Sequence, residues 1–244
     1  MALNPLLARA LIRPILRSLL RENPVSGPSD PDFSSVVLLL DFAGDDGATN
    51  ITDLSNSAHV DTFVADAQID TAITALGENT LLLDGTGDFI HFPDSADWDF
   101  GTGDFTVECS FQSAADARTG VLFSNRDDTV TGWSVQHISG TALRFLNGDT
   151  SIKAETWNPV EGTMYHVAIS RSGTSLRMFI DGVELGSATT DSTDLTGSTN
   201  TLGVGALPIP AQNVLGSIGA VRITKGVARY TANFTPPTEF YLTS

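Results

Sequence analysis

Regular alternation of apolar and polar residues constrains the fold of this chain more than any other feature. In DFTVECSF, residues 104–111, apolar side chains take every second position from Phe105 to Phe111, and the positions between them, including Glu108, are polar. The segment MYHVAISR, residues 164–171, alternates in the same way. Because successive side chains of an extended chain point to opposite faces, this period predicts β-strands with one face toward a core.

Short segments of this kind recur from residue 36 to residue 224 and are separated by turn signals. Asp181-Gly182, inside SLRMFIDGVELGS, is the strongest of these signals, because Asp-Gly favours a two-residue hairpin turn. About a dozen short strands, with no long helical pattern after residue 33, predict an all-β fold: a two-sheet antiparallel sandwich over residues 36–244. The other predicted strands are VVLLLDF, TLLLDG, FIHF, GVLFS, WSVQHI, ALRFLN, NTLGVG and LGSIGAVRIT.

Residues 1–22 are predicted to form an amphipathic helical arm. Asn4 suits the N-cap and Pro5 the first helical position, and a kink at Pro14 would reconcile two apolar arcs that otherwise face apart. A Pro-rich linker, residues 23–35, then joins the arm to the sandwich. The apolar side chains expected to dock are those of Leu6, Leu7, Leu11, Ile15, Leu16, Leu19 and Leu20.

The positive charge of the arm limits the roles that this segment can have. Arginine recurs every fourth residue from Arg9 to Arg21, which leaves no uncharged core of the length that a secretory signal needs. A helix that lies on a membrane surface fits the Arg and Leu pattern better. We expect docking to a partner protein, or to sister copies in a homo-oligomer, rather than membrane contact.

The chain as a whole is acidic, with a formal net charge of -16 and a pI of about 4.3. Nucleic acid is therefore excluded as a partner, since its phosphates require clustered Lys and Arg. The single cysteine, Cys109, cannot form an intramolecular disulfide, and its place among core residues predicts an inert buried thiol. No apolar run approaches the ~20 residues that span a bilayer.

Three stretches carry a family resemblance: LLLDGTGDFIHFPDSADWDFGTGDFTVECSF (81–111), MYHVAISRSGTSLRMFIDGVELGS (164–187) and LGSIGAVRITKGVARYTANFTPPTEF (215–240). Together they resemble the laminin-G-like, concanavalin-A-like jelly-roll domains that recur in bacteriophage structural proteins. The resemblance covers roughly residues 36–243 and leaves the arm outside. It implies that the predicted sandwich is a jelly roll.

Members of this group are sugar- or protein-binding modules on virion surfaces, mostly without known activity. The resemblance therefore implies a non-enzymatic structural, decoration or fibre protein on the surface of a phage capsid or tail. The arm would hold it to other virion proteins, and the sandwich would face outward. The alternative is an adhesin or receptor-binding module for host-surface glycans, and a glycoside hydrolase is a more remote one.

Only one pair of carboxylates resembles a catalytic set. A glycoside hydrolase places two carboxyl groups on either side of the bond that it cleaves, and DWDF offers Asp97 and Asp99 two residues apart. The third carboxylate of the family-16-type pattern Glu-x-Asp-x-Glu is missing, and the flanking Pro93 and Gly101 favour a loop with Trp98 turned inward. We therefore assign no catalytic residue and expect no enzyme activity.

Two small sets of residues are candidates for ligand binding. Asp84 and Asp88 in DGTGD are candidate calcium ligands, because calcium takes carboxylate oxygens; a hairpin turn with Asp84 accepting backbone amides is the alternative. Calcium is the one cofactor that the sequence suggests. Trp133, Trp157 and Asn158 are candidate sugar-binding residues, since this fold class uses aromatic rings beside Asn or Asp at a rim. The alternative, which the usual burial of tryptophan favours, is that both rings fill the core.

The stretch TKGVARYTANFTPP, residues 224–237, is basic and aromatic within an acidic chain. In resembling domains the tail after the last strand lies across the sandwich, so Tyr230 and Phe234 are interpreted as the anchors of a structural clasp. Lys225 and Arg229 are expected to form an exposed rim around these rings rather than a ligand site, and reversing either charge is expected to change stability little.

Overall fold

The structure covers most of the chain from residue 29 onward. In this computed structural model the described ranges are 29–114, 119–126, 131–138, 141–196, 199–207 and 212–243. The predicted helical arm, residues 1–22, lies outside the described residues and stays a prediction.

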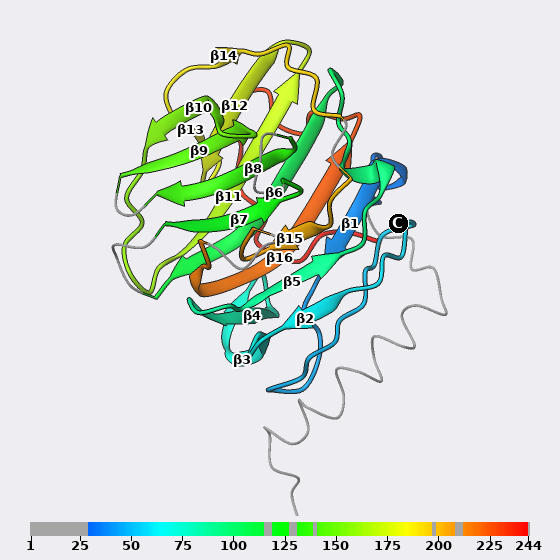
Figure 1. Cartoon of the computed structure of the whole chain (residues 1–244), viewed down its shortest axis with the longest axis vertical. Helices are drawn as coiled ribbons and strands as arrows, with labels where there is room; N and C mark the ends of the chain where they lie inside the picture. The colour runs from blue at the N-terminus through cyan, green and yellow to red at the C-terminus, as the bar shows by residue number, and fades with distance from the viewer. Residues whose placement is uncertain are drawn as a thin grey trace, which may run out of the picture.

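Two antiparallel sheets pack as a sandwich, which confirms the predicted all-β fold (Figure 1). The first sheet has the order β13-β12-β11-β6-β16-β4-β3, with β1 also paired to β16 and β14 to β12. Its strands are β1 (Val36–Leu40), β3 (Gln68–Ala75), β4 (Glu78–Asp84), β6 (Phe105–Ser113), β11 (Met164–Ser172), β12 (Ser175–Ile180), β13 (Val183–Glu184), β14 (Thr189–Thr190) and β16 (Leu215–Lys225).

The second sheet has the order β10-β9-β8-β7-β15-β5-β2. Its strands are β2 (Thr62–Val64), β5 (Phe89–Phe92), β7 (Gly120–Ser124), β8 (Trp133–Ile138), β9 (Ala142–Asn147), β10 (Thr150–Thr156) and β15 (Leu202–Val204). The helical segments of the described ranges are two 3-10 turns, Phe33–Ser35 and Ala96–Trp98. Neither is long or apolar enough to cross a membrane.

Alternate residues of both sheets fill the interior. All four apolar side chains of β6 between Phe105 and Phe111 belong to the core, as the alternation predicts. Aromatic rings connect the two sheets: Phe100 stacks on Phe105 with ring centroids 4.5 Å apart, and on Trp133 of β8 at 4.9 Å. Burial of such rings is a main source of stability in a sandwich.

The opposite face of the first sheet is also covered. Thr106 and Glu108 of β6 point away from the core, yet both have 0% exposed surface. The tail, residues 226–243 (red in Figure 1), covers them: the Thr106 hydroxyl donates to a tail carbonyl, and two tail tyrosines bond to Glu108. Farther along, Phe234 N donates to the Gly182 carbonyl oxygen at 2.9 Å.

The predicted Asp181-Gly182 turn joins β12 to β13 and also receives the tail. Both residues have a positive φ, 49° and 75°, as a type I′ hairpin turn requires. A side chain at position 182 would overlap the Phe234 carbonyl oxygen. Glycine is therefore needed here for the turn and for the close approach of the tail.

Residues 29–35 correct the predicted linker. They pack on the sandwich: Phe33 contacts the cluster of buried residues that includes Tyr241, and Asp30 forms an ion pair with Arg229 of the tail. The prediction was wrong for this segment because its Pro, Ser and Asp content carries no sign of partners about 200 positions away in the chain.

Four strands, β2, β3, β10 and β14, were not predicted. Exposed and intermediate positions dominate all four, so the apolar side of the alternation is weak in each. β2 and β10 are the edge strands of the second sheet.

Candidate functional site

A surface pocket of about 520 Å³ lies between edge strand β2 and the loop that follows β1. Among the strands of the described ranges, β2 pairs with β5, through the register Thr62–His91, Phe63–Ile90 and Val64–Phe89. The lining residues are Thr49, Asn50, Val60, Asp61, Thr62, Phe63 and Ala65.

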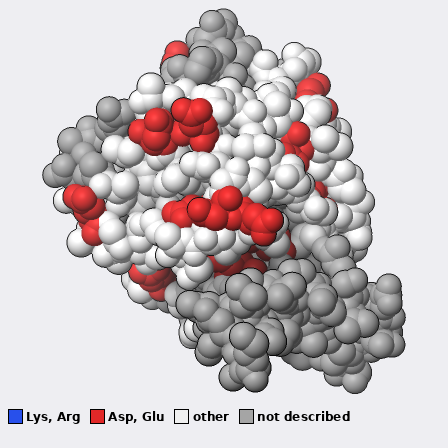
Figure 2. All heavy atoms as spheres, turned by 90° about the horizontal axis from the view of Figure 1, so that it is seen from below, with Lys and Arg blue, Asp and Glu red and all other residues white. Residues whose placement is uncertain are grey.

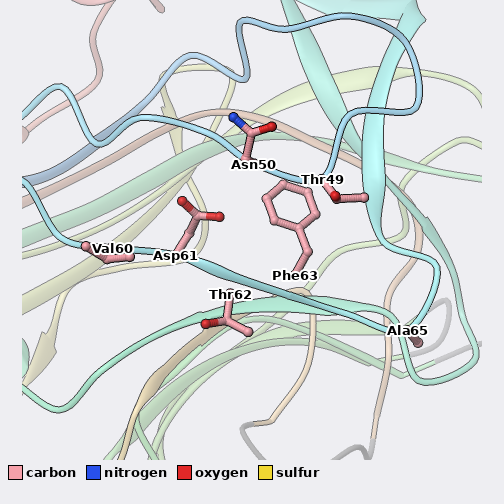
Figure 3. A pocket seen from close by; sticks show the side chains of 7 residues that line it. All are labelled: Thr49, Asn50, Val60, Asp61, Thr62, Phe63 and Ala65. Atoms are coloured by element: carbon pink, nitrogen blue, oxygen red, sulfur yellow. The ribbon is translucent and has the colours of Figure 1, made fainter.

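The alternation of β2 determines which side chains face the pocket. Asp61 and Phe63 point to the same side, toward Asn50 and Thr49, whereas Thr62 points away (Figure 3). The Phe63 ring also packs against the main core, which fixes its position. The pocket therefore presents one fixed aromatic ring beside a carboxylate, which accepts hydrogen bonds from hydroxyls, and a primary amide, which both donates and accepts.

The charge around this pocket is of one sign. The sequence contains no Lys or Arg between Arg21 and Arg118, so β2 and both of its flanking loops carry none. Figure 2, which views the molecule from the end lowest in Figure 1, shows acidic side chains and no Lys or Arg on the described part of that face. Burial raises the pKa of Asp61, although backbone N–H groups of Asp61 and Ile51 donate to its carboxylate.

The sequence did not indicate this pocket. β2 is three residues long and Asn50 lies in an irregular loop, so no motif joined them. The usable signal was the alternation of Asp61 and Phe63 next to Val60, an apolar residue that is 74% exposed.

The predicted sugar-binding residues do not form a site. Trp133 is 0% exposed, and its Nε1 donates to the Trp98 carbonyl oxygen at 2.8 Å. Trp157 is also buried, with Tyr165 packed edge-on against its ring at 5.5 Å, and only Asn158 is exposed. Both indoles belong to the core, so neither ring face is open to a sugar, which corrects that expectation in favour of the core interpretation.

Asp84 and Asp88 form a tight turn after β4. The buried Asp88 carboxylate accepts the backbone N–H groups of Asp66 at 2.8 Å and Asp84 at 2.9 Å, while Asp84 accepts from Thr86 N. This geometry is that of the turn interpretation. Within the described ranges, no three His, Cys, Asp or Glu side chains come together as a metal site. Calcium binding stays a prediction.

Asp97 is occupied by local hydrogen bonds. It lies in the 3-10 turn Ala96–Trp98, and its carboxylate bonds to the Ser57 hydroxyl at 2.8 Å and to His59 Nε2 at 2.9 Å. Trp98 is fully buried, as the loop interpretation predicted. The Asp97 carboxylate therefore connects its turn to the segment that contains Ser57 and His59, which is a structural role.

The most strongly coupled charges lie beneath the tail. Glu108 Oε1 accepts from Arg222 Nε at 2.8 Å, and its Oε2 contacts His166 Nε2 at 2.9 Å, the Tyr230 hydroxyl at 2.8 Å and the Tyr241 hydroxyl at 3.3 Å. Burial alone would raise the pKa of Glu108, but the charge of Arg222 and the hydrogen bond from His166 outweigh it and hold the pKa at about 2. Glu108 is thus a buried anion with all of its partners in place.

The two predicted clasp residues lie over this cluster. The rings of Tyr230 and Phe234 stack with centroids 3.6 Å apart and an angle of 7° between them. Both rings pack edge-on against His166 and Phe179 of the first sheet. Burial and the nearby negative charge of Glu108 raise the Tyr230 pKa well above its ordinary value.

Arg229 is not an exposed rim residue. Its guanidinium binds both carboxylate oxygens of Asp30, at 3.1 and 2.8 Å, and its side chain is only 9% exposed. Lys225 Nζ donates to the Ala96 carbonyl oxygen at 2.5 Å. The expectation of a solvated rim was wrong for Arg229, because its partner lies on the far N-terminal segment. The cluster therefore holds the tail against the first sheet.

The family comparison agrees with this architecture. The family model described as the concanavalin A-like lectin/glucanases superfamily matches residues 84–229, more than half of the chain. The chain therefore belongs to this superfamily. No curated protein matches the sequence.

Several solved structures share the fold. One is domain 4 of AbnA, a GH43 extracellular arabinanase from Geobacillus stearothermophilus, in complex with arabinotriose: the TM-score is 0.64 at 17% identity, over 80% of this chain and 94% of that one. Another is the binding domain of Paraclostridial Mosquitocidal Protein 1, with a TM-score of 0.59 at 14% identity, over 81% and 50%.

A third is botulinum neurotoxin type C, whose cell entry depends on interaction with two ganglioside molecules; the TM-score is 0.60 at 12% identity, over 80% and 49%. The chain spans about half the length of these two toxin chains. At such low identities the likeness establishes the fold alone.

Proposed function

We propose that this chain is a non-catalytic module that binds carbohydrate through the pocket beside β2. The observation that carries the proposal is the placement of the Phe63 ring, fixed by the core, beside the Asp61 carboxylate and the Asn50 amide. An aromatic face suits the C–H face of a sugar ring, and the two polar groups suit its hydroxyls. The arabinotriose complex of domain 4 of AbnA supports the choice of ligand class.

Binding to an immobilised panel of glycans tests the proposal. The full chain is expected to bind a subset of the panel, and Asn50→Ala is expected to lose that binding with its fold intact. Val160→Ala changes a side chain that is 64% exposed elsewhere and is the matched control. If Asn50→Ala binds like the unmodified chain, the pocket is not the site; if the chain cleaves any bound oligosaccharide, the non-catalytic assignment fails.

We also propose that the module stands on the surface of a virion, held to other virion proteins by residues 1–22. The resemblance of the terminal stretch, residues 215–240, to phage structural domains supports this placement, as does the Arg- and Leu-rich pattern of the arm. Because Asp30 and Phe33 pack on the sandwich, the informative truncation removes residues 1–28. This truncation should leave a β-rich fold by circular dichroism and abolish association with particles; particle binding without the arm would contradict the proposal.

A further inference from the structure

The ligand class of the pocket can be narrowed by the distribution of charge across the second sheet. β2 is at one edge of this sheet, and the basic side chains of the sheet lie on strands and loops toward the other edge. Arg144, on β9, is separated from β2 by four strands, which at ~4.8 Å per strand is about 24 Å. That distance exceeds the Debye length of about 8 Å at physiological ionic strength.

The remaining basic side chains of the described ranges form hydrogen bonds or ion pairs with oxygen atoms outside the pocket. Their partners are Asp149 for Arg126, Glu155 for Lys153, Asp191 for Arg171, Glu184 for Arg177, Glu108 for Arg222, the Ala96 carbonyl for Lys225 and Asp30 for Arg229. None of these partners lines the pocket.

The charged side chain that lines the pocket, in contrast, is acidic: it is that of Asp61. Exposed acidic residues also lie near the lining residues in the sequence: Asp45 and Asp46 come shortly before Thr49, and Asp66 comes directly after Ala65. A sialic or uronic acid carboxylate in this pocket would meet like charge, and no Lys or Arg among the described residues lies there to compensate it. The hydroxyls of an uncharged sugar would instead donate to Asp61 and exchange hydrogen bonds with Asn50.

We infer that the pocket selects uncharged saccharides and rejects sialylated or uronic acid-containing ones. The inference rests on the proposed carbohydrate-binding function and adds the ligand class to it. A preference for uncharged saccharides would distinguish this pocket from sites that recognise a glycan through an acidic sugar.

Paired glycans that differ only in a terminal acidic sugar provide the test, with affinities measured by calorimetry. The neutral member of each pair is expected to bind about tenfold more tightly, equivalent to about 1.4 kcal/mol. Raising the salt concentration should narrow this difference, because screening weakens the repulsion.

A charge-insertion variant checks that the pocket causes the preference. Val60→Lys adds a cation at the exposed edge of the pocket and should reduce the difference between neutral and acidic glycans, whereas Val160→Lys should leave it unchanged. Equal or tighter binding of the acidic glycans by the unmodified chain would overturn the inference and leave the proposed function standing. Failure to bind either class would overturn the proposed function itself.

Discussion

The face beneath the tail and the pocket beside β2 both contain carboxylates, in opposite surroundings. Glu108 is completely buried and accepts from Arg222 and two tyrosines, so its charge is neutralised inside the protein. Asp61 is partly exposed, and its carboxylate accepts hydrogen bonds from the backbone N–H groups of Asp61 and Ile51. The first arrangement holds two parts of the chain together, whereas the second leaves a carboxylate available to a ligand.

The largest effect is expected for Glu108→Gln. The variant keeps the shape of the side chain but removes the carboxylate closest to the buried Arg222, and breaking a buried pair costs about 3–5 kcal/mol. We expect the free energy of unfolding, measured by chemical denaturation, to fall by that order. The exposed Glu161→Gln is the matched control. If both variants unfold alike, the cluster under the tail does not stabilise the fold.

Acid should weaken the same cluster. The pKa of Glu108 is about 2 in the folded chain, against an ordinary value of 4.5. Because a lowered pKa stabilises the folded state only while the group is ionised, this stabilisation is complete above about pH 4.5 and is lost as the pH falls toward about 2. We expect a loss of about 3 kcal/mol across this interval in a pH series of denaturant titrations. The loss of unfolding free energy between pH 4.5 and 2 should be smaller in Glu108→Gln. If the two proteins lose the same amount over this interval, other groups cause the pH dependence.

Arg229→Glu should destabilise the tail, contrary to the sequence-based expectation. The change replaces a nearly buried two-point ion pair with two like charges at Asp30. We expect a cost of roughly 2–3 kcal/mol, between the values for exposed and buried pairs. Lys225→Glu, which has only a carbonyl partner to lose, should cost less in the same thermal melts. A smaller shift for Arg229→Glu than for Lys225→Glu would exclude this role for the Asp30 pair.

Phe234→Ala should lower the melting temperature by about as much as Arg229→Glu, or slightly less. Truncation of a fully buried phenylalanine costs about 3–5 kcal/mol, and Phe234 is partly exposed, so about 2 kcal/mol is expected. Val183→Ala removes a side chain that is 58% exposed and serves as the comparison. Phe234→Ala that melts like the unmodified chain would refute the clasp.

The smallest effect on stability is expected on the pocket side of the comparison. Asn50 is exposed in a loop, so Asn50→Ala should change the free energy of unfolding by less than about 0.5 kcal/mol while it removes glycan binding. Calorimetric melting and binding on the same preparation separate the two effects. A large loss of stability would place Asn50 with the structural residues.

Much of the sandwich was predictable because its main strands alternate strongly. The segments around Phe105 to Phe111 and Met164 to Arg171 lie in β6 and β11 as predicted, and the Asp181-Gly182 turn lies between β12 and β13. The edge strand β2 was missed, because a short and half-exposed strand has no strong period. The pocket was missed with it.

The local sequence pattern predicted on which face of a sheet a side chain lies more reliably than whether that side chain is buried or exposed. The alternation correctly placed Glu108 away from the core, but such a position is usually solvated, and here the tail buries it. The indole of Trp133 shows the converse: one aromatic residue in isolation fits a sugar site or a core, and only its neighbours Phe100 and Phe145 decide for the core.

The sequence by itself determined the class of fold, the direction of most side chains in the main strands and the acidic character of the chain. These properties depend on residues close together in the chain or on composition. The tertiary structure alone decided that Asp30 meets Arg229, that Glu108 is sealed beneath the tail, and that Asn50 faces Asp61 and Phe63 across a pocket. Such contacts join segments that only the packing of the two sheets and the path of the tail bring together, and no local period encodes them.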